Sequence, residues 1–562
     1  MPQSTHLADV LWKNPIIRMQ MRRKLRKKSV IVWGLLTLIP SLFIFLNTYN
    51  ATNYTEFNAS PEEIETAKLL ALKACFLPIF FVQAFILLFV GTGTVAGNFA
   101  EEKESGLIDY HRMTPMSPAA KIVGFVLGLP CREYLMAMLT LPFTLIAVFG
   151  GKLPLPKVVL VYVILLCLAL TYHLTAMASG MLAKKPRMAS WFSRILVILL
   201  YTFLPVISHI GLSVFGYVTF LPTLYGLFQI ELKDTFMFRG NEQVQFFEVV
   251  PFYFWKLPPV LFTFLILGLM MSVFAFMLLR KWQKDTYHPF TKRFAIGVFA
   301  VIQILVIGSL IPILLGEQRS DIVNWMSPSE IYGMVQFLYL LISLGISILL
   351  IHLITPTRHT LQNGLRRARK HKLSKIPFNW DSASSFPACV SFIVMGTLSF
   401  LGLQSIAQLS QGKMSIAPEN FTLLRTLTPL VLFSSMMLYL QASRTLWSKA
   451  GYFGFLALFW LVPLLCGMTL SAFDGDEDPL IFLGIPNPII AFLHIYTPPL
   501  EGLTENKMAK ILTLGCHVGV AVFLHLKAIH WRKEVENTMN GEDLHPAPEP
   551  PADLKPAPES AQ

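Results

Sequence analysis

The residues best suited to chemistry are four carboxylates that follow the second long apolar run. These carboxylates are Glu101, Glu102, Glu104 and Asp109, and the only basic Lys or Arg residues among them are Lys103 and Arg112. Gly106 is well placed to end a short helix within this stretch. Acidic groups are repelled by an anionic inner leaflet, so the stretch favours contact with a basic protein surface. On charge alone, a solvated loop is the alternative.

A basic amphipathic helix is predicted before the first apolar run. Asn14 is a good N-cap, and Pro15 suits the first helical position. Apolar residues then recur at every fourth position among basic ones: Ile17, Met21 and Leu25, with Arg18 and Arg22 in the basic set. Such a helix lies in the membrane interface. It is either a topology anchor, which the physics alone favours, or a lever that couples a cytosolic partner to the first span.

A charge pair, Arg132-Glu133, lies in the third apolar segment. Ionisable groups inside hydrocarbon are costly and mark functional sites. A span that begins near Lys121 would place the pair deep in the bilayer. A span that begins near Tyr134 would leave the pair at the cytoplasmic interface. We favour this second placement because it requires no charge within the hydrocarbon.

Other kinds of chemistry find little support. No Ser/His/Asp constellation, His-Glu-x-x-His motif or paired carboxylates stand out, so catalysis by this chain is not expected. Six scattered cysteines form no Cys-x-x-Cys pair, and neither a metal site nor a disulfide framework is expected. Isolated polar residues within apolar runs are expected to form hydrogen bonds between helices rather than to bind substrate. These residues are Gln83, His173, His209, Gln303 and His517.

The elements that must position these residues are membrane spans. The 562-residue chain is 54% hydrophobic and 14% charged, with a mean hydropathy of +0.56, whereas a soluble domain carries about 25% charged residues. Apolar runs of about 18 or more residues, enough to cross ~30 Å of hydrocarbon, recur throughout. We predict an all-α, polytopic transmembrane helix bundle of about twelve spans. The predicted spans are Val30–Asn47, Leu69–Val95, one that ends near Gly150, Val158–Leu182, Ile195–Phe220, Val260–Leu279, Phe294–Leu315, Ile331–Ile354, Pro387–Leu409, Leu423–Gln441, Tyr452–Phe473 and Met508–His530.

Basic residues set the predicted orientation. The net charge is +13, and the basic clusters stand at the ends of apolar runs, where lipid headgroups rather than nucleic acid account for them. The positive-inside rule makes the N-terminus cytoplasmic, and alternation then puts every strongly basic loop, including 358–375, on that side. Twelve spans return the C-terminus to the cytoplasm. The expected location is the cytoplasmic (inner) membrane, with both termini cytoplasmic.

Four regions follow from this pattern. They are an interfacial helix at 1–29, a first six-span half at 30–285, a second six-span half at 286–535 and a disordered Pro-rich tail at 536–562. Each half has a Pro-interrupted outer region before its last span, at Leu221–Pro259 and Pro479–Pro499. Short re-entrant or interfacial helices are expected there. This loose likeness leaves open whether the halves arose by duplication.

The acidic stretch carries a recognisable pattern. It reads Glu102-Lys103-Glu104-Ser105-Gly106-Leu107-Ile108, followed by Thr114-Pro115-Met116-Ser117 and Lys121. The run resembles the signature of ABC type-2 permeases, the membrane-spanning subunits of ABC exporters, although Lys103 stands where that family usually has Arg. The start at Asn14-Pro15 is similar to the family's interfacial connecting helix. The resemblance implies a loop that couples to the ATPase subunit, made of Glu102, Glu104, Gly106, Thr114 and Pro115, with Glu101 in the same acidic run.

A permease of this class needs an energy source that this chain lacks. No Gly-x-x-x-x-Gly-Lys-Ser/Thr phosphate loop is present. The resemblance therefore implies that a soluble ABC ATPase dimer binds and hydrolyses ATP, while this chain holds no cofactor. Either one chain supplies all twelve spans or two permease chains pair. The alternatives are an ATP-independent secondary transporter and a polytopic membrane enzyme that acts on a lipid-linked substrate, for which only the outer loop Glu231–Lys256 offers carboxylates.

Overall fold

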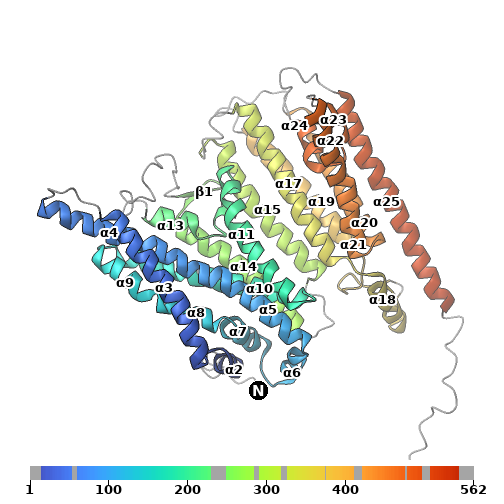
Figure 1. The fold of residues 1–562 in the computed structure, drawn as a ribbon. Helices are drawn as coiled ribbons and strands as arrows, with labels where there is room; N and C mark the ends of the chain where they lie inside the picture. Colours follow the sequence, from blue (N-terminus) through green and yellow to red (C-terminus); the bar gives the residue numbers. More distant parts are fainter. Residues whose placement is uncertain are drawn as a thin grey trace, which may run out of the picture. The chain divides into compact units, whose positions relative to one another are not determined.

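The chain folds almost entirely into helices, as the ribbon in Figure 1 shows. The structure, a computed structural model, describes residues 14–53, 60–228, 249–283, 290–317, 326–373, 375–409, 421–474, 478–496 and 507–542. Within these ranges, twelve helices are long and apolar enough to cross a membrane. The chain is therefore an all-α, multi-pass membrane protein, as its hydropathy predicts.

The described residues form two compact units. The first contains residues 1–289 and 308–326, and the second contains residues 290–307 and 327–562. The spans of the first unit are α3 (Lys27–Thr52), α4 (Pro61–Ala84) continued by η1 (Phe85–Val90) and α5 (Gly91–Glu104), α8 (Cys131–Leu139) with α9 (Leu141–Gly150), α10 (Leu155–Leu182), α11 (Pro186–His209) and α14 (Pro259–Gln283).

The second unit also contains helices that are long and apolar enough to be spans. They are α15 (Lys292–Leu314), whose last residues belong to the first unit, α17 (Pro328–Ile354), α19 (Phe386–Leu409), α20 (Leu423–Leu446), α21 (Lys449–Leu456) continued by η3 (Ala457–Leu461) and α22 (Val462–Asp474), and α25 (Lys507–Glu542). A basic helix, α18 (Arg358–Lys370), follows α17 directly.

One helix of the first unit is much longer than a bilayer requires. From Pro61 to Glu104 the chain is helical for 44 residues, or about 66 Å at 1.5 Å per residue. Ser60 and Glu63 form a capping box that starts it, and a single π-helical stretch, η1, interrupts it. Because the hydrocarbon is only ~30 Å thick, the acidic end of α5 extends beyond the hydrophobic part of the helix.

Small residues let the helices around α5 approach closely. A Cβ atom at Gly180 of α10 would lie 2.6 Å from the Ala96 carbonyl oxygen, and one at Gly97 would lie 3.1 Å from Cβ of Ser190 in α11. Glycine at these positions brings the backbones of α5, α10 and α11 together, as small residues do in membrane helix pairs.

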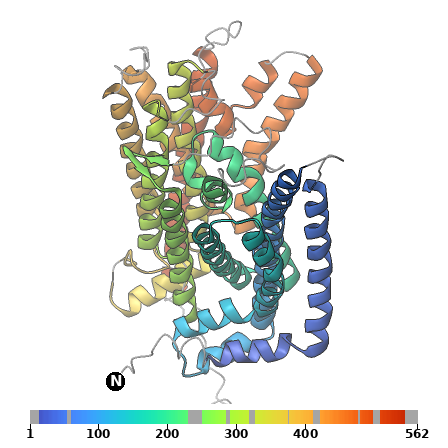
Figure 2. The same cartoon turned by 90° about the vertical axis from the view of Figure 1, so that its left-hand side faces the viewer.

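Three short helices gather at one end of the first unit. They are α2 (Pro15–Lys24), α6 (Leu107–Met113) and α7 (Pro118–Gly128). In Figure 2, α2 runs crosswise below the upright α3 that follows it. The helix predicted at the N-terminus is thus present. The third apolar segment breaks into α7, α8 and α9.

Several boundaries differ from their predictions. The span expected at Ile195–Phe220 is α11, which begins at Pro186, ends at His209 and is followed by Gly211 at φ +105°. The first Pro-interrupted region contains α13 (Leu221–Phe228) and an antiparallel hairpin of β1 (Val250–Phe252) and β2 (Trp255–Leu257), in which Val250 pairs with Leu257.

The second Pro-interrupted region holds two short helices, α23 (Asp478–Leu483) and α24 (Pro488–Tyr496). Helix α25 reaches Glu542, so the first residues of the predicted tail are helical. The rest of that tail, from 543, and most of the Glu231–Lys256 loop lie outside the described residues.

The contact at Gly180 yields a test of the packing. We expect Gly180→Ala to lower the thermal unfolding temperature of the detergent-purified protein, because overpacking costs about 1–3 kcal/mol. Gly268→Ala in α14 is the control, since its Cβ would meet nothing within 4 Å. That variant should be neutral or slightly stabilising. Equal unfolding temperatures for the two variants would contradict the close approach of α10 and α5.

Candidate functional site

Asn14 fixes the start of α2 against α7. Its side-chain oxygen accepts a hydrogen bond from the Ile16 backbone N–H at 3.0 Å, and its Nδ2 donates to the Ala120 carbonyl at 2.8 Å. The side chain is 2% exposed. The predicted N-cap is therefore confirmed, with Pro15 at the first helical position, and the same residue also ties two helices together.

Glycines of α7 let α2 rest on its backbone. A Cβ atom at Gly124 would lie 2.8 Å from Oδ1 of Asn14, and one at Gly128 would lie 3.2 Å from Cα of Ile17. The two glycines are four residues apart, so they lie on one face of α7. Helix α2 is thus held against the protein by close contact with the backbone of α7.

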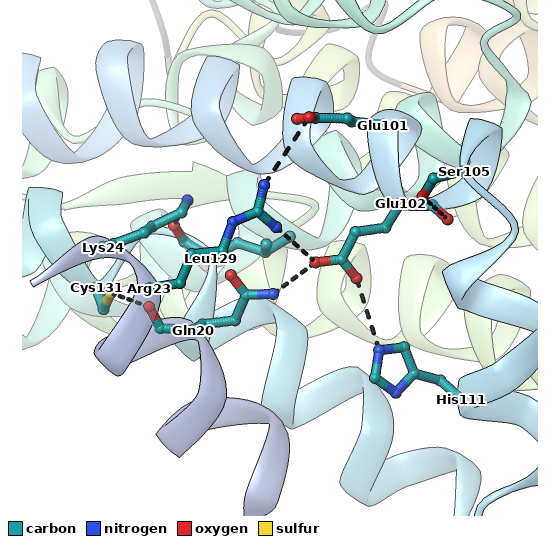
Figure 3. Close-up of polar contacts among 9 residues, drawn as sticks. All are labelled: Gln20, Arg23, Lys24, Glu101, Glu102, Ser105, His111, Leu129 and Cys131. Carbon is teal, nitrogen blue, oxygen red and sulfur yellow. Dashed lines mark hydrogen bonds and ion pairs between the residues drawn. The ribbon is translucent and has the colours of Figure 1, made fainter.

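Glu102 is the centre of this end of the molecule (Figure 3). Its side chain is 2% exposed, although it lies in the last turn of α5. Gln20 of α2 donates from Nε2 to Oε1 of Glu102 at 2.5 Å, and the Arg23 guanidinium lies 3.9 Å from the same oxygen. Nε2 of His111 in α6 lies 3.9 Å from Oε2. One carboxylate therefore contacts both α2 and α6.

The acidic residues at the end of α5 point in different directions. Glu102 points inward, whereas Glu101 and Glu104 are exposed. Glu101 lies 3.9 Å from Arg23. Glu102 and Glu104 are separated by about 200° around the helix, so the two carboxylates point in opposite directions. The side of Glu102 is the inner one because α2 and α6 pack there.

The turn after α5 has the geometry that its residues predict. Gly106 has φ +77°, a left-handed conformation that favours glycine, and it separates α5 from α6. Thr114 follows α6, where its hydroxyl donates to the His111 carbonyl at 2.7 Å. Pro115 is exposed in the bend between α6 and α7.

Helix α6 presents an apolar face to the outside. Leu107, Tyr110 and Met113 are 45%, 63% and 78% exposed, and their three-residue spacing puts them on one side of the helix. Glu104 and Asp109 are exposed beside them. We call these five residues the α6 face. Asp109 also pairs with Arg112 at 2.5 Å.

The other side of α6 is firmly packed. Ile108 and His111 are buried, and the His111 ring meets Phe125 of α7 edge to face at 5.4 Å. Phe125 in turn stacks on Trp282 of α14 at 5.6 Å. Because these contacts fix its inner side, α6 presents its outer side in one orientation.

Two lysines attach helix ends within the same assembly. Lys103 donates from Nζ to the carbonyls of Met181 and Ala183, at 2.6 and 3.3 Å, at the end of α10. Lys121 donates to the Arg112 and Thr114 carbonyls, both at 3.1 Å. Lysine satisfies C-terminal carbonyls and the negative end of the helix dipole in this way. These roles were missed from sequence, since the partners are backbone carbonyls, which no side-chain pattern marks.

The predicted charge pair is present but buried. Arg132 Nη2 lies 2.7 Å from Oε1 of Glu133, which is 0% exposed. Thr94 of α5 donates to the same oxygen at 2.9 Å, and the Arg132 guanidinium lies 4.2 Å from the Trp33 ring centroid of α3. The pair lies in the first turn of α8, where the helix dipole stabilises a carboxylate. Trp33 of α3 and Thr94 of α5 cover it, so its burial comes from neighbouring helices.

The isolated polar residues of the spans connect helices, as expected. Gln83 donates to Thr140 and Thr144, and His173 contacts the Tyr134 hydroxyl at 3.0 Å. In the second unit, Gln303 contacts Ser343 and Tyr339, and His517 contacts the Ile485 carbonyl. The side chain of His209 lies outside what the structure describes. No group of three or more His, Cys, Asp or Glu side chains among the described residues is placed to hold a metal ion.

The remaining basic residues of α2 divide into inner and outer sets. Lys24 donates to the Leu129 carbonyl, and burial lowers the pKa of its ammonium while Glu133 opposes that shift. Arg18 and Arg22 are exposed, and neither has a hydrogen bond or ion pair with another described residue. These two remain available for headgroups or a partner.

Burial lowers the pKa of the His111 imidazole, and the nearby Lys121 ammonium lowers it further. Both effects favour the neutral form of the ring, in which its 3.9 Å approach to Glu102 is a polar contact.

Comparison with known proteins does not extend these observations: no protein-family model, curated protein or solved structure matches the chain.

The contacts of Glu102 predict what holds α2 in place. We expect Gln20→Leu to release α2, because it leaves a buried carboxylate without its closest donor, at a cost of about 1.5–3 kcal/mol. Hydrogen exchange of residues 15–24 measures the effect. Arg18→Gln, at an exposed position of the same helix, should leave the exchange unchanged. Equal protection in both variants would show that Glu102 does not hold α2.

The lowered pKa of His111 predicts a pH dependence. The folded-state pKa is below the unfolded value of about 6.5, so the unfolded chain binds the proton first as pH falls. The free energy of unfolding should thus decrease as pH drops from about 7 to about 5. His111→Phe, which retains the ring contact with Phe125, should lose part of this dependence in thermal unfolding. Identical pH profiles would contradict the assignment.

Proposed function

We propose that this chain is the permease subunit of an ATP-driven ABC exporter and that a separate soluble ATPase docks on the α6 face. One observation carries the proposal. Outside the spans, large apolar side chains flanked by carboxylates are exposed on a short helix whose inner side is anchored to Glu102 and Phe125. The sequence resemblance to type-2 permeases falls on the same segment.

The chemistry of the α6 face suits a protein better than a membrane. Burying a large apolar side chain gains about 1.5–3 kcal/mol, and Tyr110 and Met113 are the most exposed of the three. Anionic headgroups would repel Glu104 and Asp109. A partner surface with an apolar pocket and basic residues around it would satisfy both sets of groups.

The contacts between α5, α6 and α2 would allow a force on α6 to reach the spans. Helix α5 continues through η1 into α4, and Glu102 joins the end of α5 to Gln20 of α2. Helix α2 is followed by α3 after only two residues, Leu25 and Arg26. Movement of an ATPase against α6 would therefore reach two spans at once. This favours the lever interpretation of α2 over a simple anchor.

The proposal also includes a location and an orientation. The α2 end would face the cytoplasm of a cell whose inner membrane holds the chain, with both termini on that side, because its basic residues follow the positive-inside rule. ATP would be bound by the dimeric partner. Either one chain or a pair of permease chains forms the translocation path.

One observation favours a second candidate, an ATP-independent secondary transporter. Glu133 is a fully buried carboxylate inside the membrane-spanning part of the first unit, and such groups serve as proton relays in transporters. Its ion pair with Arg132 and its hydrogen bond from Thr94 equally suit a structural role, so we rank this candidate second.

The α6 face yields a direct test of the first candidate. The tagged chain is purified from its native membranes, and co-purifying proteins and ATP hydrolysis are measured. We expect a soluble protein with a nucleotide-binding motif to accompany the wild type. The double variant Tyr110→Ala, Met113→Ala should lose at least ~90% of it, since two buried apolar side chains would contribute several kcal/mol.

The control replaces Leu42 and Phe43 with Ala. These apolar side chains of α3 are 45% and 68% exposed within a span, so their loss should not affect ATPase association. Substrate movement by the purified chain in liposomes without ATP would contradict the first candidate and support the second.

A further inference from the structure

A second polar cluster lies in the second unit, where α17 and α20 end. His352 is two residues from the end of α17, and Arg444 is two residues from the end of α20. Trp447 and Ser448 alone separate α20 from α21, and Ser448 caps α21 by accepting the Gly451 N–H at 3.2 Å. This tight turn brings Tyr452 back beside Arg444.

The three side chains lie close together. The rings of His352 and Tyr452 stack with centroids 5.8 Å apart. The Arg444 guanidinium is near enough to both rings for its charge to act on them. Lys449 adds a further positive charge near His352.

Each of these side chains has a buried polar atom without a hydrogen-bond partner. The atoms are Nδ1 of His352, Nε of Arg444 and the Tyr452 hydroxyl. Arg444 is 2% exposed and Tyr452 is 0% exposed. Buried polar groups in proteins are nearly always satisfied, so these three atoms in one cluster are groups that a ligand could satisfy.

The charge of the cluster specifies the kind of ligand. The Arg444 guanidinium keeps its proton at any physiological pH, and its one hydrogen bond within the described residues goes to the Trp447 carbonyl at 3.2 Å. Among the described residues no carboxylate pairs with it. A buried guanidinium without a counter-ion is strongly unfavourable, and it recognises phosphate oxygens particularly well.

The adjacent helix points to the same ligand. Between Arg358 and Lys375 the chain has seven Lys or Arg residues and no Asp or Glu. Leu361, Gly364 and Ala368 face inward on α18, so most of the basic residues are exposed. A polybasic helix immediately after a span is typical of attraction to anionic lipid headgroups.

We propose that His352, Arg444 and Tyr452 form a phosphate-binding site, with α18 attracting the ligand to it. The Arg444 guanidinium and the Tyr452 hydroxyl donate to phosphate oxygens, and the His352 imidazole completes the set through Nδ1. The phosphate belongs either to an anionic phospholipid or to free inorganic phosphate. This inference does not rest on the proposed transport function.

The test uses the full chain purified in detergent. Phosphatidylglycerol is titrated in one arm and inorganic phosphate in the other, with phosphatidylcholine as the lipid control. Binding is followed by thermal unfolding and by native mass spectrometry. We expect saturable binding in at least one of the two phosphate arms. Arg444→Gln should weaken it about tenfold or more, since a charge-assisted bond is lost.

Two further variants keep the result interpretable. Tyr452→Phe removes only the hydroxyl, leaves the ring contact with His352 in place and should also weaken binding. Lys510→Gln removes one exposed positive charge in the first turn of α25 and should bind as the wild type does.

Two results would overturn the proposal. One is unchanged binding in both site variants. The other is the absence of any preference of the wild type for phosphatidylglycerol or phosphate over phosphatidylcholine. Binding of phosphatidylglycerol alone identifies a lipid site, and binding of inorganic phosphate alone identifies a site for the free anion.

Discussion

A single buried carboxylate organises the end of the first unit. Glu102 could not remain inside without donors, because a desolvated carboxylate is strongly unfavourable. Gln20 and Arg23 of α2 and His111 of α6 surround it. The need to satisfy this one group places α2 across the end of α5 and fixes the direction in which α6 presents its outer side.

Neighbouring acidic residues in the sequence have different surroundings in the structure. Glu102 supports the assembly from within, while Glu104 and the apolar residues of α6 face outward. The stacking of Phe125 on Trp282 supports the inner side of α6. The role of docking surface remains our proposal, whereas the packing that supports it is observed.

Much of the fold could be predicted because the signals are local. Runs of apolar residues predict the spans, Asn14 and Pro15 predict the start of α2, and Gly106 predicts the end of α5. The orientation of Glu102 could not be predicted, since successive residues on a helix point about 100° apart and only tertiary packing distinguishes inside from outside. The burial of the Arg132–Glu133 pair was missed for the same reason, since Trp33 covers Arg132 and Thr94 covers Glu133 from other helices.

The most direct measurement places a photo-crosslinking amino acid at position 110 and irradiates native membranes. Tyr110 is 63% exposed at the centre of the α6 face, so a docked protein must lie within reach of the probe. The account predicts one dominant adduct, to a soluble nucleotide-binding protein. Adducts to lipid alone, or to other parts of the same chain, would contradict it.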